Sequence, residues 1–359
     1  MRIDADILIV GGALAVASRR MLRAVGIWPT VAAQAQPIFQ VKASDGRPGE
    51  GASPLFLHFD AAEIEEGPMG HMLEDRHLFA AFRAALAAAP GVTLLPGETV
   101  VAQDTASGRA GVTLASGRRL TGRLIAGCDG RGSGTAARAG IARVGWDYGQ
   151  TALVTAVEHD LAHAGIAHQF FMPEGPLAIL PLPGNRSSIV WTAGAAQAAA
   201  VQALDHAGYL AALRPRFGDF LGGVRLAGVR FTYPLGLSLA QSFVAPRLAL
   251  VGDAAHGIHP IAGQGLNLGL RDAAALAEVL ILAARRGEDI GSPDVLARYQ
   301  RWRRFDTALM AVGTDTVNRL FSNDNPLLRG LRDLGMGLVT GIPALRRGLM
   351  RQAAGLTGD

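Results

Sequence analysis

The sequence predicts an α/β protein with three parts: a domain built on a parallel sheet, a second domain of mixed β-sheet, and a helical C-terminal region. Residues 4–10 form a β-branched run that ends at Gly11 and Gly12, which is typical of the first strand of a parallel sheet. Residues 151–236 alternate strand-like runs with Pro and Gly. From residue 293 onward the apolar residues recur at helical spacing.

The amino-acid composition fits this fold class. A chain of 359 residues is long enough for two domains, and a hydrophobic content of 49% is enough for a buried core. Aromatic residues make up only 6% of the chain, whereas it has 46 glycines. Because small residues let helices pack closely on sheets, this mixture favours an α/β fold over a β-sandwich.

Composition and charge also exclude several classes of protein. Cys128 is the single cysteine, so no internal disulfide can form, and a reducing compartment, the cytoplasm, is predicted. No apolar run reaches the roughly 18 residues of a transmembrane helix, and the N-terminal apolar run is too short for a signal peptide. The formal net charge is only +4, and the basic residues are not interleaved with aromatic ones, so nucleic acid is not an expected partner.

The first half of the chain is predicted to contain a helix directly after the glycine pair, over residues 14–25, and another over residues 74–88. Short runs of alternating apolar residues around these helices predict strands. The predicted strands cover residues 39–42, 55–59, 69–73, 92–95, 99–104, 111–114 and 123–126.

The second half begins with the β-rich block. Its predicted strands cover residues 151–158, 167–172, 177–182 and 187–192. One helix, over residues 195–213, is expected to end before Pro215. A buried strand over residues 247–251 then leads into a glycine-rich turn and a helix over residues 266–286.

The strongest functional motif occupies residues 248–270, which read LALVGDAAHGIHPIAGQGLNLGL. A buried strand delivers Asp253 to the C-terminal edge of a sheet, where ligands bind in open α/β folds. The glycines that follow let the backbone approach a planar ligand, and free N–H groups at the start of the next helix can hold an anionic group. By its glycines alone, the motif is explained equally well by a structural strand-to-helix turn.

A second motif, AGCDGRGS over residues 126–133, follows a predicted strand. A bare Asp-Gly pair such as Asp129-Gly130 is usually only a turn. Arg76, at the start of a predicted helix, is on its own an ordinary solvated side chain. Neither feature predicts a site without further support.

Together these motifs resemble those of the FAD-dependent aromatic hydroxylases of the para-hydroxybenzoate-hydroxylase-like family. Residues 248–270 resemble the second flavin motif of that family, and Asp129-Gly130 resembles its Asp-Gly motif. Arg76 matches a position whose side chain reaches the phosphate–ribityl region of the flavin. Other stretches resemble the subgroup of ubiquinone-biosynthesis hydroxylases, and the resemblance covers nearly all of the chain from residue 14 onward. These stretches are residues 174–182 with 190–192, residues 233–235 and residues 299–304.

The resemblance implies a Rossmann-like FAD-binding domain, NAD(P)H as electron donor and O2 as co-substrate. Members of the subgroup bind O2 as a C4a-hydroperoxide of the flavin and hydroxylate an electron-rich ring, here that of a polyprenylated phenol. It further implies a place in a ubiquinone-biosynthesis complex. No catalytic residue is assigned, because the flavin carries the oxygen chemistry.

In this family an Asp at position 253 suits a ribityl hydroxyl, and the helix amides suit the N1–C2=O edge of the flavin. Gly175, Pro176 and Pro181 could shape the wall over the flavin ring at the substrate pocket, with a proline-rich β-turn as the alternative. The candidate cofactor-binding residues are Gly11, Gly12, Arg76, Asp129, Gly130, Gly252, Asp253, Pro260, Gly263, Gln264, Gly265, Leu266 and Asn267.

The FAD-binding domain is predicted to be discontinuous, with a β-rich substrate domain inserted in it. The FAD-binding domain comprises residues 1–37, 74–150 and 237–300, the substrate domain residues 38–73 and 151–236, and the helical C-terminal region residues 301–359. Residues 314–355 mix apolar residues with Arg at helical spacing, which indicates a peripheral contact with the inner face of a membrane. A tail packed on the core with its Arg side chains outward is the alternative.

The N-terminal segment departs from the family. A dinucleotide fingerprint needs a strand, G-x-G-x-x-G, a helix, a second strand and an acidic residue about 20 residues further on. Gly11 keeps only the first glycine, while Ala13 and Val16 stand at the other two positions. Residues 13–28 resemble instead the helix that follows the first βαβ unit in the family. The resemblance therefore implies that this unit is missing between Gly12 and Ala13, and we expect FAD to bind weakly.

The missing unit leaves other functions open. One is a catalytically impaired homologue that acts as a binding partner in quinone biosynthesis. Another is a related flavoprotein, such as a halogenase or a prenyl-lipid reductase; a halogenase would need a catalytic lysine, and Lys42 is the only lysine. His256 and His259 are three residues apart, but no Cys or acidic cluster completes a metal shell, so no metal site is predicted.

Overall fold

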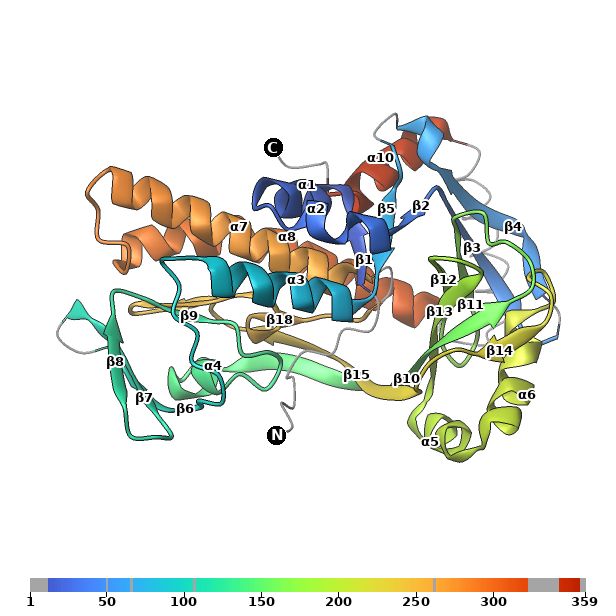
Figure 1. Ribbon diagram of the computed structural model, residues 1–359, viewed down its shortest axis with the longest axis horizontal. Coiled ribbons are helices and arrows are strands. Elements are labelled where there is room, and N and C mark those ends of the chain that lie inside the picture. Colours follow the sequence, from blue (N-terminus) through green and yellow to red (C-terminus); the bar gives the residue numbers. More distant parts are fainter. Residues whose placement is uncertain are drawn as a thin grey trace.

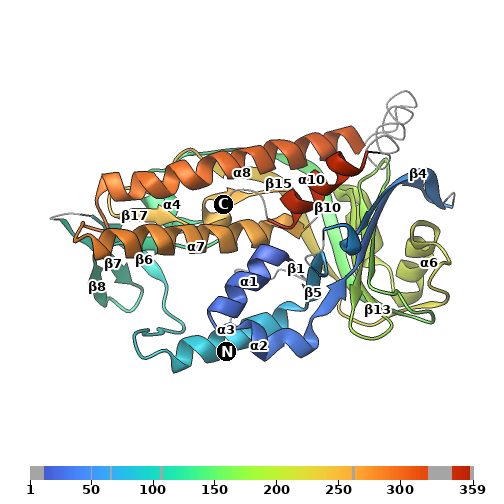
Figure 2. The ribbon, with the colours of Figure 1, turned by 90° about the horizontal axis from the view of Figure 1, so that it is seen from above.

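The computed structural model describes residues 12–49, 51–64, 67–105, 108–260, 263–321 and 342–355. Two long helices lie side by side along the length of the molecule, and much of a large sheet, with two short helices, forms one end (Figures 1 and 2). The helices are α7 (Gln264–Arg285) and α8 (Pro293–Phe321). All the strands of the described chain precede α7 in the sequence, and they form the large sheet and three smaller sheets.

The large sheet has nine strands, and its central strand pairs are antiparallel. Only β11 and β3 run parallel to each other among the strand pairs of this sheet in the described chain. Its strands are, in order, β18 (His256–Gly257), β15 (Phe231–Ala240), β10 (Arg143–His159), β13 (Arg186–Gly194), β12 (Leu177–Leu182), β11 (Ile166–Phe171), β3 (Gln40–Arg47) and β4 (Gly51–Asp60), with β14 (Val224–Leu226) on β10.

One face of the large sheet is covered by α5 (Ala195–Ala203) and α6 (His206–Phe217). Alternate residues of β12 and β13, such as Ile179 and Trp191, are buried under these helices together with Tyr209. The opposite face is also apolar, so the sheet supplies a second surface that can face the rest of the molecule.

A small antiparallel sheet of β1 (Gly12–Ala15), β5 (Gly70–Leu73) and β2 (Gln36–Ile38) lies near the start of the chain. Its helices share one hydrophobic core with β1 and with the start of α7. They are α1 (Val16–Ala24), α2 (Trp28–Val31), followed by the 3-10 turn η1 (Ala32–Gln34), and α3 (Asp75–Ala88).

A third sheet places β9 (Ile125–Gly127) parallel to β17 (Leu248–Leu250), with β16 (Val244–Ala245) antiparallel on the other side of β17. The fully buried β17 packs with side chains of α7 and α8. The remaining elements are η2 (Ala61–Glu63), the sheet β6 (Val100–Asp104), β7 (Ala110–Leu114) and β8 (Arg119–Gly122), α4 (Gly134–Arg138), η4 (Gly252–Ala254) and α10 (Pro343–Ala353).

Several sequence predictions of elements were wrong. Residues 92–95 form no strand, and β8 was not predicted. The single helix expected over 195–213 is two helices, because Leu204 is extended and Asp205 starts α6 by accepting a hydrogen bond from the Gly208 amide at 2.7 Å. Pro215 lies inside α6, near its C-terminal end. The helix expected from residue 14 begins at Val16, after a strand.

The predicted first strand, residues 4–10, lies outside the described residues, so β9 and β17 are the parallel strands seen at this end of the molecule. The proposed division into domains stays a prediction. Within the segment 38–73, β3 and β4 join the large sheet, whereas β5 pairs with β1 and β2. None of the helices in the described part of the chain is both long enough and apolar enough to cross a membrane.

Candidate functional site

The turn after β17 carries Asp253. Gly252 has a φ of +62°, a conformation that favours glycine, and it turns the chain out of the strand into η4. A Cβ on Gly252 would lie 3.6 Å from the Cα of Gly269 in α7, so the turn and the helix are in direct contact. The sequence therefore places the Asp253 carboxylate at the C-terminal end of a buried strand, beside a helix.

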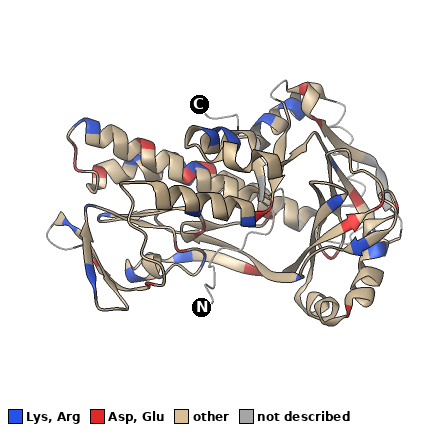
Figure 3. Ribbon diagram, viewed as in Figure 1, with Lys and Arg blue, Asp and Glu red and all other residues tan. Residues whose placement is uncertain are grey.

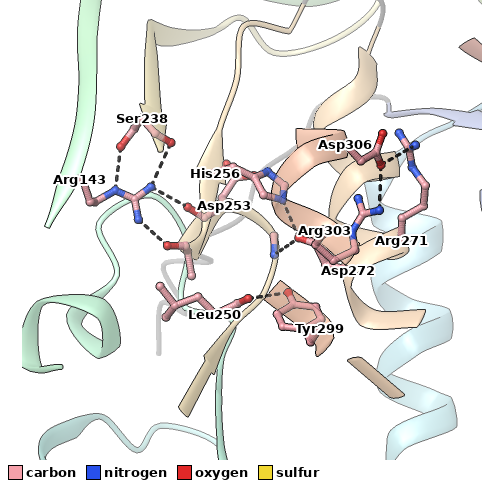
Figure 4. A network of polar contacts seen from close by, with 12 residues as sticks. Arg143, Ser238, Leu250, Asp253, His256, Arg271, Asp272, Tyr299, Arg303 and Asp306 are labelled. Carbon is pink, nitrogen blue, oxygen red and sulfur yellow. Dashed lines mark hydrogen bonds and ion pairs between the residues drawn. The ribbon is translucent and has the colours of Figure 1, made fainter. Parts of the chain in front are cut away.

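A buried carboxylate, that of Asp272, holds this turn from one side (Figure 4). Asp272 of α7 is fully buried and accepts hydrogen bonds from the Gly252 amide at 3.0 Å and from Nε2 of His256 at 2.6 Å. Its other oxygen accepts a hydrogen bond from Nε of Arg303 at 2.7 Å. Burial alone would raise the pKa of Asp272, but the hydrogen bond from His256 and the charge of Arg303 lower it below its ordinary value.

The same network joins α8 to the turn. Arg303 also pairs with Asp306 at 2.8 Å, and Asp306 accepts a hydrogen bond from Arg271 of α7 at 3.1 Å. The buried Tyr299 hydroxyl donates to the carbonyl oxygen of Leu250, the last residue of β17, at 2.7 Å, and burial raises the pKa of Tyr299. Strand, turn and both helices are thus connected by hydrogen bonds in a protein interior, where such contacts are strong.

Arg143, the first residue of β10, holds the turn from the opposite side (Figure 4). Its guanidinium donates to the carbonyl oxygens of Asp253, at 3.2 Å, and of Ala254, and to the Ser238 hydroxyl at 2.8 Å. These contacts engage only backbone oxygens of the turn, so they leave the Asp253 carboxylate available for other partners.

The Asp253 carboxylate meets Arg131, which follows the Asp129-Gly130 pair. Nε of Arg131 lies 3.2 Å from Oδ2 of Asp253, and the same guanidinium donates to the Ile258 carbonyl oxygen at 3.0 Å. Both side chains are partly exposed, at 42% for Arg131 and 38% for Asp253, so a ligand can reach them. Arg131 lies across Gly257, where a Cβ would come within 3.0 Å of its Nε.

The start of α7 lies beyond this turn. Gly263 has a φ of +62° and precedes the helix, and a Cβ added to Gly265 would meet no atom within 4 Å. The buried Asn267 side chain connects this helix start to α1: its Oδ1 accepts from the Ala15 amide at 2.9 Å and from the Ser18 hydroxyl at 2.6 Å, and its Nδ2 donates to the Gly263 carbonyl at 3.1 Å. Asn267 therefore shapes the helix start through contacts within the chain.

Asp129 also makes its contacts within the chain. Its carboxylate accepts hydrogen bonds from the Ser133 hydroxyl at 2.5 Å and from the Thr135 amide at 2.8 Å, at the start of α4. Burial works against ionisation of Asp129, but these hydrogen bonds lower its pKa. Gly130, with a φ of +78°, turns the chain between them. The carboxylate thus stabilises a helix start.

The remaining predicted residues lie in several different elements. Arg76 is 66% exposed at the start of α3 and pairs with Glu74 at 2.9 Å. Gly175 has a φ of +139°, and a Cβ there would come within 2.7 Å of Thr192. By the alternation of β12, Pro181 shares the sheet face that α5 and α6 cover. Gly11 lies outside the described residues, Gly12 is the first residue of β1, and Pro260, Gln264 and Leu266 lie in the turn and helix that follow Asp253.

Sequence reasoning missed the residues that hold the turn in place: Asp272, Arg303, Arg143 and Arg131. Asp272 lies on the same helix as Asn267, and Arg303 belongs to a cluster of arginines visible in the sequence, so each had a weak signal. Arg143 had none, because its partner Asp253 is 110 residues away. In the described chain no group of three or more His, Cys, Asp or Glu side chains could hold a metal ion.

Comparison with known proteins gives the family. Residues 7–311 match the model of the FAD binding domain. The chain is 46% identical over 343 residues to ubiquinone hydroxylase UbiL of Rhodospirillum rubrum, which covers 96% of this chain and 79% of that protein. It is 36% identical over 345 residues to the 3-demethoxyubiquinol 3-hydroxylase of Escherichia coli, which covers 96% of this chain and 86% of that protein.

Solved structures share the fold. The p-nitrophenol 4-monooxygenase PnpA of Pseudomonas putida superposes with a TM-score of 0.80 at 19% identity, over 100% of this chain and 90% of that one. PqsL of Pseudomonas aeruginosa superposes with a TM-score of 0.72 at 22% identity, over 91% of this chain and 90% of that one. By sequence and by fold, the chain belongs to the FAD-binding-domain family of flavin-dependent monooxygenases that includes the ubiquinone hydroxylases.

Proposed function

We propose that the protein is a flavin-dependent monooxygenase that hydroxylates a polyprenylated phenol in ubiquinone biosynthesis, with NAD(P)H as electron donor and O2 as co-substrate. The observation that carries this proposal is the Asp253 turn, which is fixed by Asp272 on one side and by Arg143 on the other. The names of its relatives, a ubiquinone hydroxylase and a demethoxyubiquinol hydroxylase, support the substrate class.

The residues around the turn fit the ring end of a flavin. The Asp253 carboxylate can accept hydrogen bonds from ribityl hydroxyls, and the first amides of α7 can donate to the electron-rich N1–C2=O edge of the ring. The open space at Gly265 lets a planar group approach these amides. We assign Gly252, Asp253, Pro260 and the helix start around Gly263 to this part of the site.

The residues at the other end do not fit the adenosine part of FAD. A dinucleotide-binding unit needs a phosphate-binding helix directly after its glycine loop, and here the chain enters β1 at Gly12. The acidic residue that would bind the adenosine ribose is also missing, since residues 12–44 contain neither Asp nor Glu. We therefore expect the affinity for FAD to be low.

When bound, the flavin would supply the activation of oxygen, and the protein would position the phenol and keep water out. The sheet face opposite α5 and α6 offers an apolar surface for a prenylated ring, with Ala152, Val154 and Leu235 buried on it. The Tyr233 hydroxyl lies beside this surface, buried and without a hydrogen-bond partner among the described residues. Burial and the charge of Asp75 raise the pKa of Tyr233, so its hydroxyl stays protonated and could donate to the phenol oxygen.

The proposal is tested by incubating the purified protein with flavin, NAD(P)H and a prenylated phenol. We expect consumption of NAD(P)H and a product heavier by one oxygen atom in mass spectrometry. A protein that binds flavin and consumes no NAD(P)H with any such phenol would support the second candidate, a binding partner in quinone biosynthesis. The poor fit at the adenosine end is the observation that favours this alternative.

We also propose that the C-terminal region contacts the inner face of a membrane, from which a polyprenyl substrate could enter. Arginines gather on α10 (Figure 3). Arg347 and Arg351 are exposed, whereas Arg346 pairs with Glu63 at 2.7 Å. On α8, Phe305 and Val312 are exposed at 77% and 64%. Apolar and cationic side chains together favour an anionic lipid surface. Co-sedimentation with anionic liposomes at low and high salt tests this, and no binding at low salt would contradict it.

A further inference from the structure

We infer that this site recognises a flavin by its ring, its ribityl chain and its first phosphate only, so that flavin mononucleotide (FMN) binds about as tightly as FAD. The inference rests on the proposed flavin site at Asp253. It follows from three features: the path of the chain after Gly12, the partners of the polar side chains near the predicted diphosphate, and the place of Arg131.

The chain after Gly12 does not form an adenosine-binding unit. β1 pairs antiparallel with β5 from Gly12 opposite Leu73 to Ala15 opposite Gly70, and α1 begins at the next residue. The two strands are close, because a Cβ on Gly70 would come within 2.8 Å of the Leu14 carbonyl oxygen. No parallel strand is formed by residues 12–38.

The segment of β1 and α1 packs with α3 in one hydrophobic core. Leu14 of β1, Leu22 of α1 and Leu78 of α3 are buried at 1%, 0% and 6% exposure in one cluster, and Leu266 of α7 packs against it. The buried hydrogen bond from Ser18 to Asn267 connects the same segment to α7. The segment is thus held by apolar contacts, and apolar side chains offer the polar groups of an adenosine no hydrogen bonds.

The polar groups that the family resemblance assigns to the phosphate side of the flavin have other partners. The Asp129 carboxylate is bonded to Ser133 and Thr135 at the start of α4. Arg76 is mostly exposed and paired with Glu74. The first acidic residue after Gly12 is Asp45, which is 2% exposed in β3 and so cannot meet a ribose in solvent. The adenylate part of FAD would therefore gain few hydrogen bonds from Asp129, Arg76 or Asp45.

Arg131 supplies a cation next to the ribityl anchor. It touches the Asp253 carboxylate through Nε and the Ile258 carbonyl through one terminal nitrogen, and its other terminal nitrogen has no partner in the described part of the chain. A guanidinium binds phosphate oxygens well because its N–H groups form a planar fork. A phosphate joined to a ribityl chain at Asp253 would carry its charge close to Arg131. One phosphate is enough for this contact, and FMN has one.

The test is a set of titrations of the flavin-free protein with FAD, FMN and riboflavin, followed by flavin fluorescence and calorimetry. We expect dissociation constants for FAD and FMN that agree within about threefold, and riboflavin weaker by about tenfold, which is about 1.4 kcal/mol, because it lacks the charged phosphate that Arg131 binds. FAD tighter than FMN by about thirtyfold or more would overturn the inference and leave the flavin site standing. Failure of all three to bind would remove the flavin site itself.

Variants of Arg131 separate a phosphate contact from a general effect on the turn. Arg131→Gln is expected to weaken FMN about tenfold and to leave riboflavin unchanged, whereas Arg131→Lys keeps the charge and most of the affinity. Arg225→Gln is the matched control, since Arg225 is 63% exposed on β14. Equal losses for FMN and riboflavin in Arg131→Gln would mean that Arg131 acts on Asp253 and not on phosphate. Thermal melting checks that each variant is folded.

Discussion

The two ends of the proposed flavin site are built in different ways. At the ring end, the Asp253 turn is held by ion pairs and hydrogen bonds from β10, α7 and α8. At the adenosine end, β1 and α1 are held mainly by apolar packing, and the segment has no carboxylate of its own. Charged partners fix positions in a binding site, whereas apolar packing fixes a fold without offering contacts to a polar ligand.

This difference suggests that the two halves of a dinucleotide site can be separated. The buried partners of the turn, such as Asp272 and Tyr299, come from helices that follow Asp253 in the chain and not from its N-terminal segment. The geometry of the ring end therefore does not require a complete first βαβ unit. Substitutions at each end test this separation.

The largest effect is expected from Asp272→Asn. Loss of this buried charge leaves His256 without its carboxylate partner and Arg303 with Asp306 alone, and breaking a buried pair costs about 3–5 kcal/mol. Urea unfolding measures the loss, and flavin binding should fall with it. Glu278→Gln, an exposed position on the same helix, is the control and should change little. A loss for Asp272→Asn below about 1 kcal/mol would show that the network does not hold the turn.

Asp253→Asn should change binding and not stability. Its pairing with Arg131 is partly exposed, and such pairs contribute about 0–1 kcal/mol to folding. The lost hydrogen bonds to ribityl hydroxyls should raise the dissociation constants of FMN and riboflavin about tenfold or more. Titration of the exposed variant Asp219→Asn gives the baseline. Unchanged affinities in Asp253→Asn would place the flavin elsewhere.

Lowering the pH should reduce the folding stability through histidines at both ends. Burial lowers the pKa of His71, on β5, and of His259, beside the turn, to about 4 each. Between their unfolded pKa, about 6.5, and pH 4 the unfolded chain binds more protons, so stability falls as the pH drops through this window. We expect a loss of about 1–2 kcal/mol per histidine between pH 7 and pH 5. Urea unfolding of His71→Gln and His259→Gln should each show a smaller pH dependence than the parent.

The smallest effect is expected from Ser18→Ala. The Ser18 side chain connects the two ends of the site. The substitution removes one buried hydrogen bond to Asn267, with a cost of about 0.5–1.5 kcal/mol in unfolding. Flavin affinity should change less than about threefold, because Asn267 keeps its hydrogen bonds to Ala15 and Gly263. A larger loss of affinity than of stability would mean that the α1 segment takes part in flavin binding.

The sequence allowed prediction of the turn itself, because a buried strand followed by Asp253 and spaced glycines is a local pattern. It also allowed the departure at Gly12 to be seen, since a missing glycine fingerprint is local too. The partners of the turn could not be predicted, because Arg143 and Arg131 reach Asp253 from 110 and 122 residues away. The roles of Asp129 and Asn267 within the chain were missed for a related reason: a side chain that fits a ligand in a family pattern also fits the nearest free amide.

β10 connects the Asp253 turn to the apolar face of the large sheet, and its pairing bears on how these two parts move. This strand of 17 residues contacts the Asp253 turn at Arg143 and continues into the apolar face at Ala152 and Val154, with a shift in its pairing to β15 between Asp147 and Gln150. Residues 150–154 of β10 pair with both β15 and β13, whereas residues 143–147 pair with β15 alone. The strand therefore bends most easily at the shift, and the turn and the apolar face can change their relative orientation there.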